Sequence, residues 1–327
     1  MCERVDADRK EPIMSTLENG MLVQHASLGQ GTIVALDAKA VHVFFPTSGA
    51  QFATKLRLPM ALSFLTPSTS PSAWLASLSG FALDGKTGRY GRACAWLSHE
   101  DAVARFLEAF PLGFADPKYT GAGKQRGERA CRWRRANEAF VEALGGGQGE
   151  RLLAAGEIGE LVERTLRVER HVRTLHKDAA KISFEDGLKD PAAARGFFAA
   201  LFELLATTTP ERSRFEALAA AVVPLAPSAP RESGWPMVTL LPFIARPDLH
   251  MLLRPRFACE VAQRLGLELA YVAEPNWSTY SALLASAEQL LEKLRPLGAR
   301  DHVDVESFMH VSTAKHARPP LSVPAAT

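Results

Sequence analysis

Short apolar runs separated by turn-forming residues occur in the first fifth of the chain, and this pattern predicts short β-strands. The runs with this pattern are rich in β-branched or aromatic residues and cover residues 21–23, 32–36, 41–45 and 52–56. The stretches between them are short and contain turn-forming residues, as in an antiparallel meander. We therefore expect a flexible leader over 1–18, a small barrel over 19–66 and a linker over 67–75.

Beyond the linker, apolar residues recur at helical spacing. Ser98 precedes Asp101 by three residues, which is a capping pattern, and Asp190-Pro191 and Thr209-Pro210 place a capping side chain before a proline. The further predicted helices cover 126–144, 157–176, 191–206, 210–222, 256–265 and 278–294. The fold class expected is α+β, a small N-terminal SH3/Tudor-like β-barrel followed by a mostly α-helical domain.

The expected helical domain covers 76–312, with a sub-boundary in the proline-rich stretch 224–234 and a disordered tail over 313–327. No run of about 18 apolar residues is present, so the sequence predicts no membrane span. The first ten residues are charged and lack the apolar centre of a secretory signal, and we expect a cytoplasmic protein.

The charge and the cysteine content limit the kinds of binding site that the sequence predicts. The 38 Lys and Arg nearly balance the 36 Asp and Glu, so any nucleic-acid interface must come from local clustering. The four cysteines show no C-x-x-C spacing, so they predict neither a zinc site nor a disulfide framework. No cofactor is expected.

Two basic segments stand out. The first is interleaved with Tyr119 and Trp133 and contains Lys118, Lys124, Arg126, Arg129, Arg132, Arg134 and Arg135. On a helix, Arg129, Arg132 and Arg135 fall on adjacent turns and form a positive strip, while Trp133 could stack on a base. The second contains Arg164, Arg167, Arg170, Arg173 and Lys177. The alternative interpretation, solvated helix faces whose arginines pair with acidic neighbours, stays open.

Residues 80–87, GFALDGKT, match the phosphate-loop pattern of nucleotide-binding proteins. A working loop needs a buried strand before it and a helix that starts at the lysine, whereas 77–79 is a poor strand and Gly88 and Gly91 weaken a helix. We therefore expect a hairpin turn at Asp84-Gly85 after the run 81–83.

Near the C-terminus, strand-like alternation would place His302, Asp304 and Glu306 on one face, a set compatible with a metal ion. A charged edge strand gives the same pattern. His250 beside Asp248 and Arg254 is a candidate catalytic corner, but no motif ties a nucleophile to it, and no catalytic residue is assigned.

The run 20–34, GMLVQHASLGQGTIV, with 41–45 and Gly49, resembles a known small barrel. It is similar to the Tudor-like module at the C-terminus of UvrD-type helicases and to the RNA-polymerase-interacting domain of CarD-type transcription factors. The matching positions are Val23, His25, Gly29 and Gly31. The resemblance implies a docking role for His25, Gly29 and Gly31, toward RNA polymerase or a repair complex. The C-terminal half is similar to blocks in uncharacterised bacterial proteins, some linked to phage defence.

These patterns favour a nucleic-acid-binding or transcription- and repair-associated protein that docks through its small barrel and carries a basic helical surface. One alternative is an adaptor subunit of a bacterial anti-phage defence system that makes no direct contact with nucleic acid. A nuclease-type or nucleotide-binding enzyme is the third, although paired carboxylates and a lysine at nuclease spacing are not found.

Overall fold

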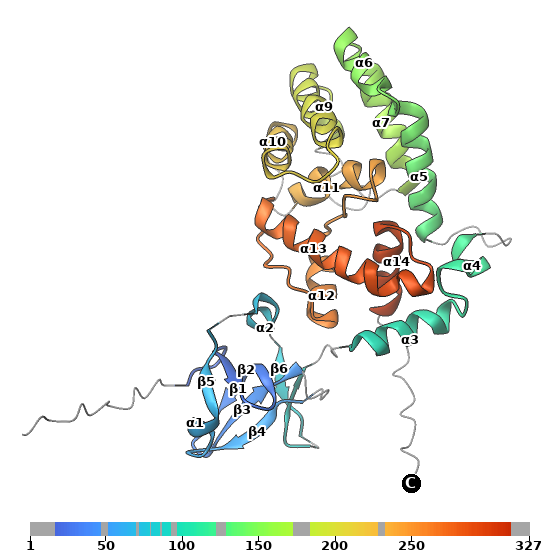
Figure 1. Ribbon diagram of the computed structural model, residues 1–327. Helices are drawn as coiled ribbons and strands as arrows, with labels where there is room; N and C mark the ends of the chain where they lie inside the picture. Colours follow the sequence, from blue (N-terminus) through green and yellow to red (C-terminus); the bar gives the residue numbers. More distant parts are fainter. Residues whose placement is uncertain are drawn as a thin grey trace, which may run out of the picture. The chain divides into compact units, whose positions relative to one another are not determined.

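The computed structural model describes residues 17–46, 52–69, 72–78, 80–85, 87–92, 97–121, 129–172, 184–227 and 233–314. The chain divides into two compact units, Met1–Ala95 and Trp96–Thr327, whose elements are labelled in Figure 1. The predicted leader, except for residues 17 and 18, and the predicted tail from residue 315 lie outside the described residues.

The N-terminal unit contains a five-stranded antiparallel sheet in the order β4-β3-β2-β1-β5. Its strands are β1 (Leu22–His25), β2 (Gly29–Leu36), β3 (Ala40–Phe44), β4 (Thr54–Arg57) and β5 (Leu65–Pro67). The four strands expected from the short β-prone runs are present. The expected closed barrel is wrong, because β4 and β5 are the two edges of an open sheet and do not pair with each other. With three residues and a proline at its end, β5 offers too few backbone donors for a second ladder.

The β1–β2 connection depends on two glycines for different reasons. Gly29 has a φ of 74°, in the left-handed region that glycine adopts without strain. Gly31 does not have a positive φ. It is required because a Cβ there would lie 2.6 Å from Cδ1 of Phe45, a core residue of the sheet. Both glycines thus have a structural role.

Residues 67–75, predicted as a linker, include the end of β5 and the start of helix α2 (Ala73–Ser77), which Ser72 caps. The short helix α1 (Ala61–Phe64) precedes β5. Strands β6 (Phe81–Leu83) and β7 (Tyr90–Arg92) form an antiparallel hairpin, which confirms the turn predicted at Asp84-Gly85. A strand therefore follows the turn where a phosphate loop would need a helix.

The second unit is helical. Its α-helices are α3 (His99–Ala109), α4 (Pro117–Thr120), α5 (Arg129–Leu144), α6 (Gln148–Ala155), α7 (Ile158–Val172), α9 (Pro191–Leu205), α10 (Arg212–Val222), α11 (Gly234–Ala245), α12 (Pro255–Leu265), α13 (Trp277–Leu294) and α14 (His302–Ser312). The caps at Ser98 and Asp190 are confirmed, since each side chain accepts a backbone N–H of the first turn. The Thr209-Pro210 start is wrong, because α10 begins at Arg212 after Glu211.

Helix α14 lies in the core of this unit and packs against α13, α3 and α5. The strand predicted over 301–306 is wrong, because Asp301 caps α14 and His302 to Met309 are buried without a break. A helix that is buried on every side has no polar stripe. The alternation of its valines with polar residues gave the pattern expected of a strand. In the part of the chain that the structure describes, no helix combines the length and the apolar character needed to cross a membrane.

Candidate nucleic-acid interface

Helices α5 and α7 carry the basic residues singled out from the sequence. Each helix has an apolar stripe at helical spacing: α5 buries Ala130, Trp133, Ala136 and Phe140, and α7 buries Leu161 and Val168. Gly145 to Gly147 end α5, and α6 connects it to α7, which runs back along α5 (Figure 1). The two helices are therefore antiparallel neighbours, with the start of α5 near the end of α7.

A hydrogen bond identifies the sides that face each other. Arg164 of α7 donates from Nη1 to the backbone oxygen of Ala143 in α5 at 2.9 Å. On α5, Arg132 and Arg135 lie close to the same side of the helix as Ala143, by the 3.6-residue period. On α7, Arg167 and His171 lie close to the side of Arg164. These basic residues thus lie near the line along which α5 and α7 pack against each other.

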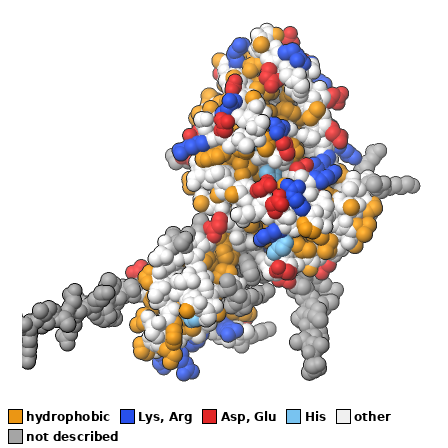
Figure 2. Space-filling model, in the orientation of Figure 1, with side chains coloured by type: hydrophobic (Ala, Val, Ile, Leu, Met, Phe, Trp, Pro, Cys, Tyr) orange, Lys and Arg blue, Asp and Glu red, His pale blue; other side chains and the backbone are white. Residues whose placement is uncertain are grey.

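We call Arg132, Arg135, Arg167 and Arg170 the α5–α7 strip. All four are exposed. Arg167 pairs with Glu163 at 2.7 Å, whereas Arg132, Arg135 and Arg170 have no ion-pair partner among the described residues. Arg170 and His171 lie in the last turn of α7, where the helix dipole favours positive charge. Figure 2 shows Lys, Arg, Asp and Glu side chains interleaved on the visible face of the helical unit, so ion pairing decides which cations stay available.

The other predicted contact residues have different places. Lys118 is exposed on α4, which packs against α5. Arg129 is the first residue of α5. Lys124, Arg126 and Arg173 lie outside the described residues. Helix α7 also brings His171, which the sequence analysis did not select, to the edge of the strip; its distance of four residues from Arg167 was the available signal.

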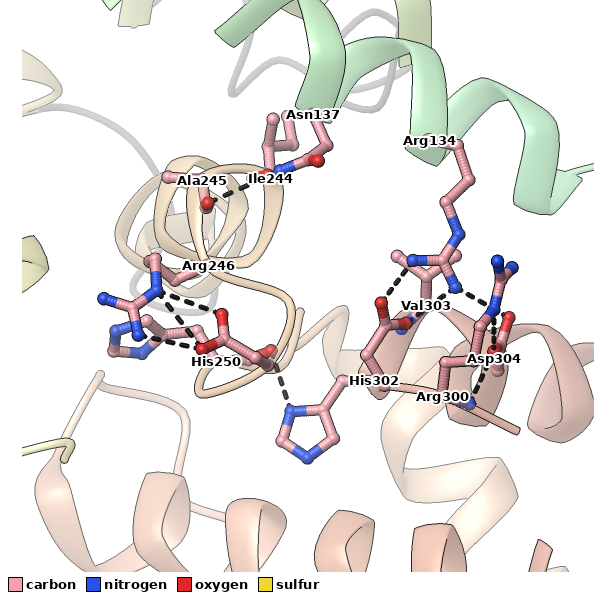
Figure 3. Close-up of polar contacts among 12 residues, drawn as sticks. Arg134, Asn137, Ile244, Ala245, Arg246, His250, Arg300, His302, Val303 and Asp304 are labelled. Carbon is pink, nitrogen blue, oxygen red and sulfur yellow. Dashed lines mark hydrogen bonds and ion pairs between the residues drawn. The ribbon is translucent and has the colours of Figure 1, made fainter. Parts of the chain in front are cut away.

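Two residues of the basic segment point inward. Trp133 is 3% exposed, and its Nε1 donates to Glu306 at 3.1 Å, so its indole is not free to stack on a base and that prediction is wrong. Arg134 reaches from α5 to the start of α14, where it donates to Asp301 and to Asp304 (Figure 3). The spacing of charges alone does not distinguish Arg134 from the exposed arginines beside it.

Asp304 and Glu306 are the buried anions that receive these groups. The Asp304 carboxylate is 0% exposed and accepts hydrogen bonds from Arg134 at 2.9 Å and from the Tyr119 hydroxyl at 2.7 Å. Burial and the adjacent Asp304 carboxylate raise the pKa of Tyr119, so the phenol stays protonated and donates. Glu306 accepts from Arg254 at 2.5 Å. Both acids of the set compatible with a metal ion are therefore engaged by protein donors, and the described residues hold no metal-binding cluster.

His250 is buried, with Nδ1 3.1 Å from the hydroxyl of Tyr280. Its backbone oxygen accepts from Nδ1 of His302, as Figure 3 shows. Burial, followed by the charges of Arg246 and His302, lowers the pKa of His250 to about 4. Asp248 pairs with Arg246. The histidine of the candidate catalytic corner is thus buried and neutral inside a packed core.

The residues expected to dock in the N-terminal unit form a tight turn. Nδ1 of His25 accepts the backbone N–H groups of Ser27 and Leu28 at 3.2 and 3.3 Å, which holds the turn between β1 and β2. Its ring lies 5.7 Å from that of Phe45 and 6.2 Å from that of Phe64. His25 therefore has a structural role and also borders the exposed side of α1.

Comparisons with protein-family models, with curated proteins and with solved structures find no match to this chain.

The Asp304 cluster should be a large contributor to the stability of the helical unit. Replacing Asp304 by Ala leaves Arg134 and Tyr119 without their buried acceptor, and we expect a loss of about 3–5 kcal/mol in the free energy of unfolding. Asp248→Ala, which breaks the exposed pair with Arg246, should cost less than about 1 kcal/mol. Thermal and denaturant unfolding of both variants would test this; equal losses would contradict it.

His250 should make stability depend on pH. Below its ordinary pKa of 6.5 the unfolded chain takes up a proton that the folded chain refuses until about pH 4, so stability should fall as the pH drops between these values. The full effect of this one group is about 3 kcal/mol. In His250→Gln the fall between pH 6.5 and 4 should be smaller, while His310→Gln, at an exposed position, should follow the parent protein. Superimposable unfolding profiles for the parent and His250→Gln would refute this assignment.

Proposed function

We propose that this protein binds nucleic acid through the α5–α7 strip. The observation that supports the proposal is the presence of three exposed arginines that have no ion-pair partner among the described residues, Arg132, Arg135 and Arg170, on matching ends of two antiparallel helices. Guanidinium groups bind phosphate oxygens in bidentate geometry, and several on one surface can follow a backbone. Binding through phosphates would be insensitive to base sequence.

Because the α5–α7 strip is exposed, the effect of its residues on binding can be measured separately from any effect on folding. The side chains of Arg132 and Arg135 are exposed and are not part of the buried stripe of α5, so reversing their charge leaves the buried contacts of Trp133 and Arg134 in place. A loss of binding in such a variant would therefore report on the surface.

We expect Arg132→Glu/Arg135→Glu to weaken the binding of labelled DNA or RNA in fluorescence anisotropy. For duplex DNA, the logarithm of the affinity should fall with the logarithm of the salt concentration by about 0.9 for each phosphate contacted, so the slope should flatten by about 2 in the variant. The matched control is Arg195→Glu/Arg256→Glu, which reverses two exposed charges on α9 and α12. Equal affinities and slopes for the two double variants would refute the proposal.

A second candidate function, docking to a protein partner, is favoured by a patch on the N-terminal unit. Met60, Leu62 and Phe64, which we call the α1 patch, are 64%, 50% and 52% exposed. The backbone of Lys39 and Arg57 lies close to the start of the α1 patch. The N–H of Leu58, two residues before Met60, donates to the backbone oxygen of Lys39 at 2.8 Å, and Arg57 is the last residue of β4. Figure 2 shows hydrophobic and basic side chains together on this unit. Exposed apolar side chains with a polar rim are typical of protein contacts.

If the protein is an adaptor, a partner should remain bound after nuclease treatment and should be lost with Met60→Ser/Phe64→Ser. Leu83→Ser removes a similarly exposed side chain from β6 of the same unit and should have no effect. Co-purification followed by quantification of the partner would measure both. Retention of the partner by the double variant would exclude the α1 patch as the contact.

A further inference from the structure

A small recess opens between the start of α3, the end of α12 and the middle of α13. Its volume is about 100 Å³. The apolar part of its wall comes from Leu97, Ala102, Leu265, Leu267, Leu290 and Phe308, and the polar part comes from His99, Ser286, Gln289 and Lys293. We call it the α13 recess. It belongs entirely to the helical unit.

The polar side chains of the recess converge because of helix periodicity. Ser286, Gln289 and Lys293 are separated by three and four residues, so they share one face of α13. His99 is the first residue of α3 and lies across the recess. The four side chains therefore come from two helices and face a common space.

These four side chains have no hydrogen-bond or ion-pair partner within the described ranges. Gln289 and Lys293 are exposed, whereas Ser286 is only 7% exposed. The hydroxyl of Ser286 is not among the fully buried atoms without a partner, so it is open to the recess. By contrast, the hydroxyls of Ser281 and Ser312 bond to backbone oxygens of their own helices at 3.1 and 2.7 Å. The recess thus has polar groups that a ligand could satisfy.

The charge of the recess comes from one group, the Lys293 ammonium. Burial, with the nearby charge of Lys293, lowers the pKa of His99, so its imidazole is neutral at pH 7. The other charged residues near Lys293 on α13 are already engaged: Glu292 pairs with Arg295, and Glu288 lies 3.6 Å from Nε2 of His302. Glu100 follows His99 and does not line the recess, but its exposed carboxylate interacts electrostatically with Lys293. A ligand that matches this surface carries a single negative charge.

We propose that the α13 recess binds a small monocarboxylate with a short apolar chain. The carboxylate would accept from Lys293, Ser286 and Gln289, and the chain would contact Leu97, Leu267 and Phe308. An inorganic phosphate would match the donors but would place polar oxygens against the apolar wall. The volume limits the ligand to a few non-hydrogen atoms inside the recess.

Saturation-transfer NMR of butyrate with the full-length protein tests this inference, with chloride held constant. We expect a signal from the butyrate methyl group and none from butyramide, which has the same shape without the charge. Lys293→Met should weaken binding by about tenfold or more, because a charge-assisted hydrogen bond is lost. Lys189→Met, which changes a lysine paired with Asp186 elsewhere, is the matched control and should bind as the parent does.

Ser286→Ala provides a second variant, which removes one hydroxyl and leaves every charge in place. It should weaken butyrate binding severalfold while the thermal unfolding temperature stays about the same, because no hydrogen bond within the described residues is removed. The inference fails if the parent protein gives no butyrate signal, if butyramide binds equally, or if Lys293→Met retains the parent's affinity. Displacement of butyrate by equimolar inorganic phosphate would overturn the assignment to a carboxylate with an apolar chain.

Discussion

The neutralisation of two buried carboxylates is the constraint on which the helical unit depends. Asp304 and Glu306 lie on α14 with side chains that are 0% and 1% exposed. A buried carboxylate costs several kcal/mol unless charged and polar donors surround it. Those donors come from distant parts of the chain, Arg134 from α5 and Arg254 from the residue before α12. The two acids therefore determine where α5 and the start of α12 lie against α14.

The other end of α14 is held by arginines too. Arg105 of α3 and Arg264 of α12 are both buried and donate to the backbone oxygens of Ser312 and Thr313. Free carbonyl groups at a helix C-terminus favour positive charge, so this arrangement is the counterpart of the Asp301 cap at the other end. With both ends held, α14 supports α5, whose exposed side chains include Arg132 and Arg135.

The sequence pattern predicted the helices that have one apolar and one polar face. The stripes of α5, α7 and α13 and the caps at Ser98 and Asp190 are local signals, and the structure has these helices. Helix α14 lacks such a contrast, because polar residues in its interior are satisfied by partners from distant helices that no local pattern reveals. Barrel closure failed for a similar reason, since it required an edge partner for β4 that the three-residue β5 does not provide. The direction of Arg134 likewise depends on Asp301 and Asp304, more than 160 residues away.

Ion pairing, more than composition, distinguishes the roles of the arginines in this nearly neutral chain. Arg134 and Arg254 have buried anionic partners, and Arg167 pairs with a glutamate one turn away on its own helix. Their charge is already compensated, so a phosphate would have to compete with a carboxylate for them. Arg132 and Arg135 have no such competitor in the described part of the chain, and their hydrated guanidinium groups lose little by exchanging water for phosphate. The same stretch of α5 can therefore anchor the fold through one arginine and leave its neighbours available to a polyanion.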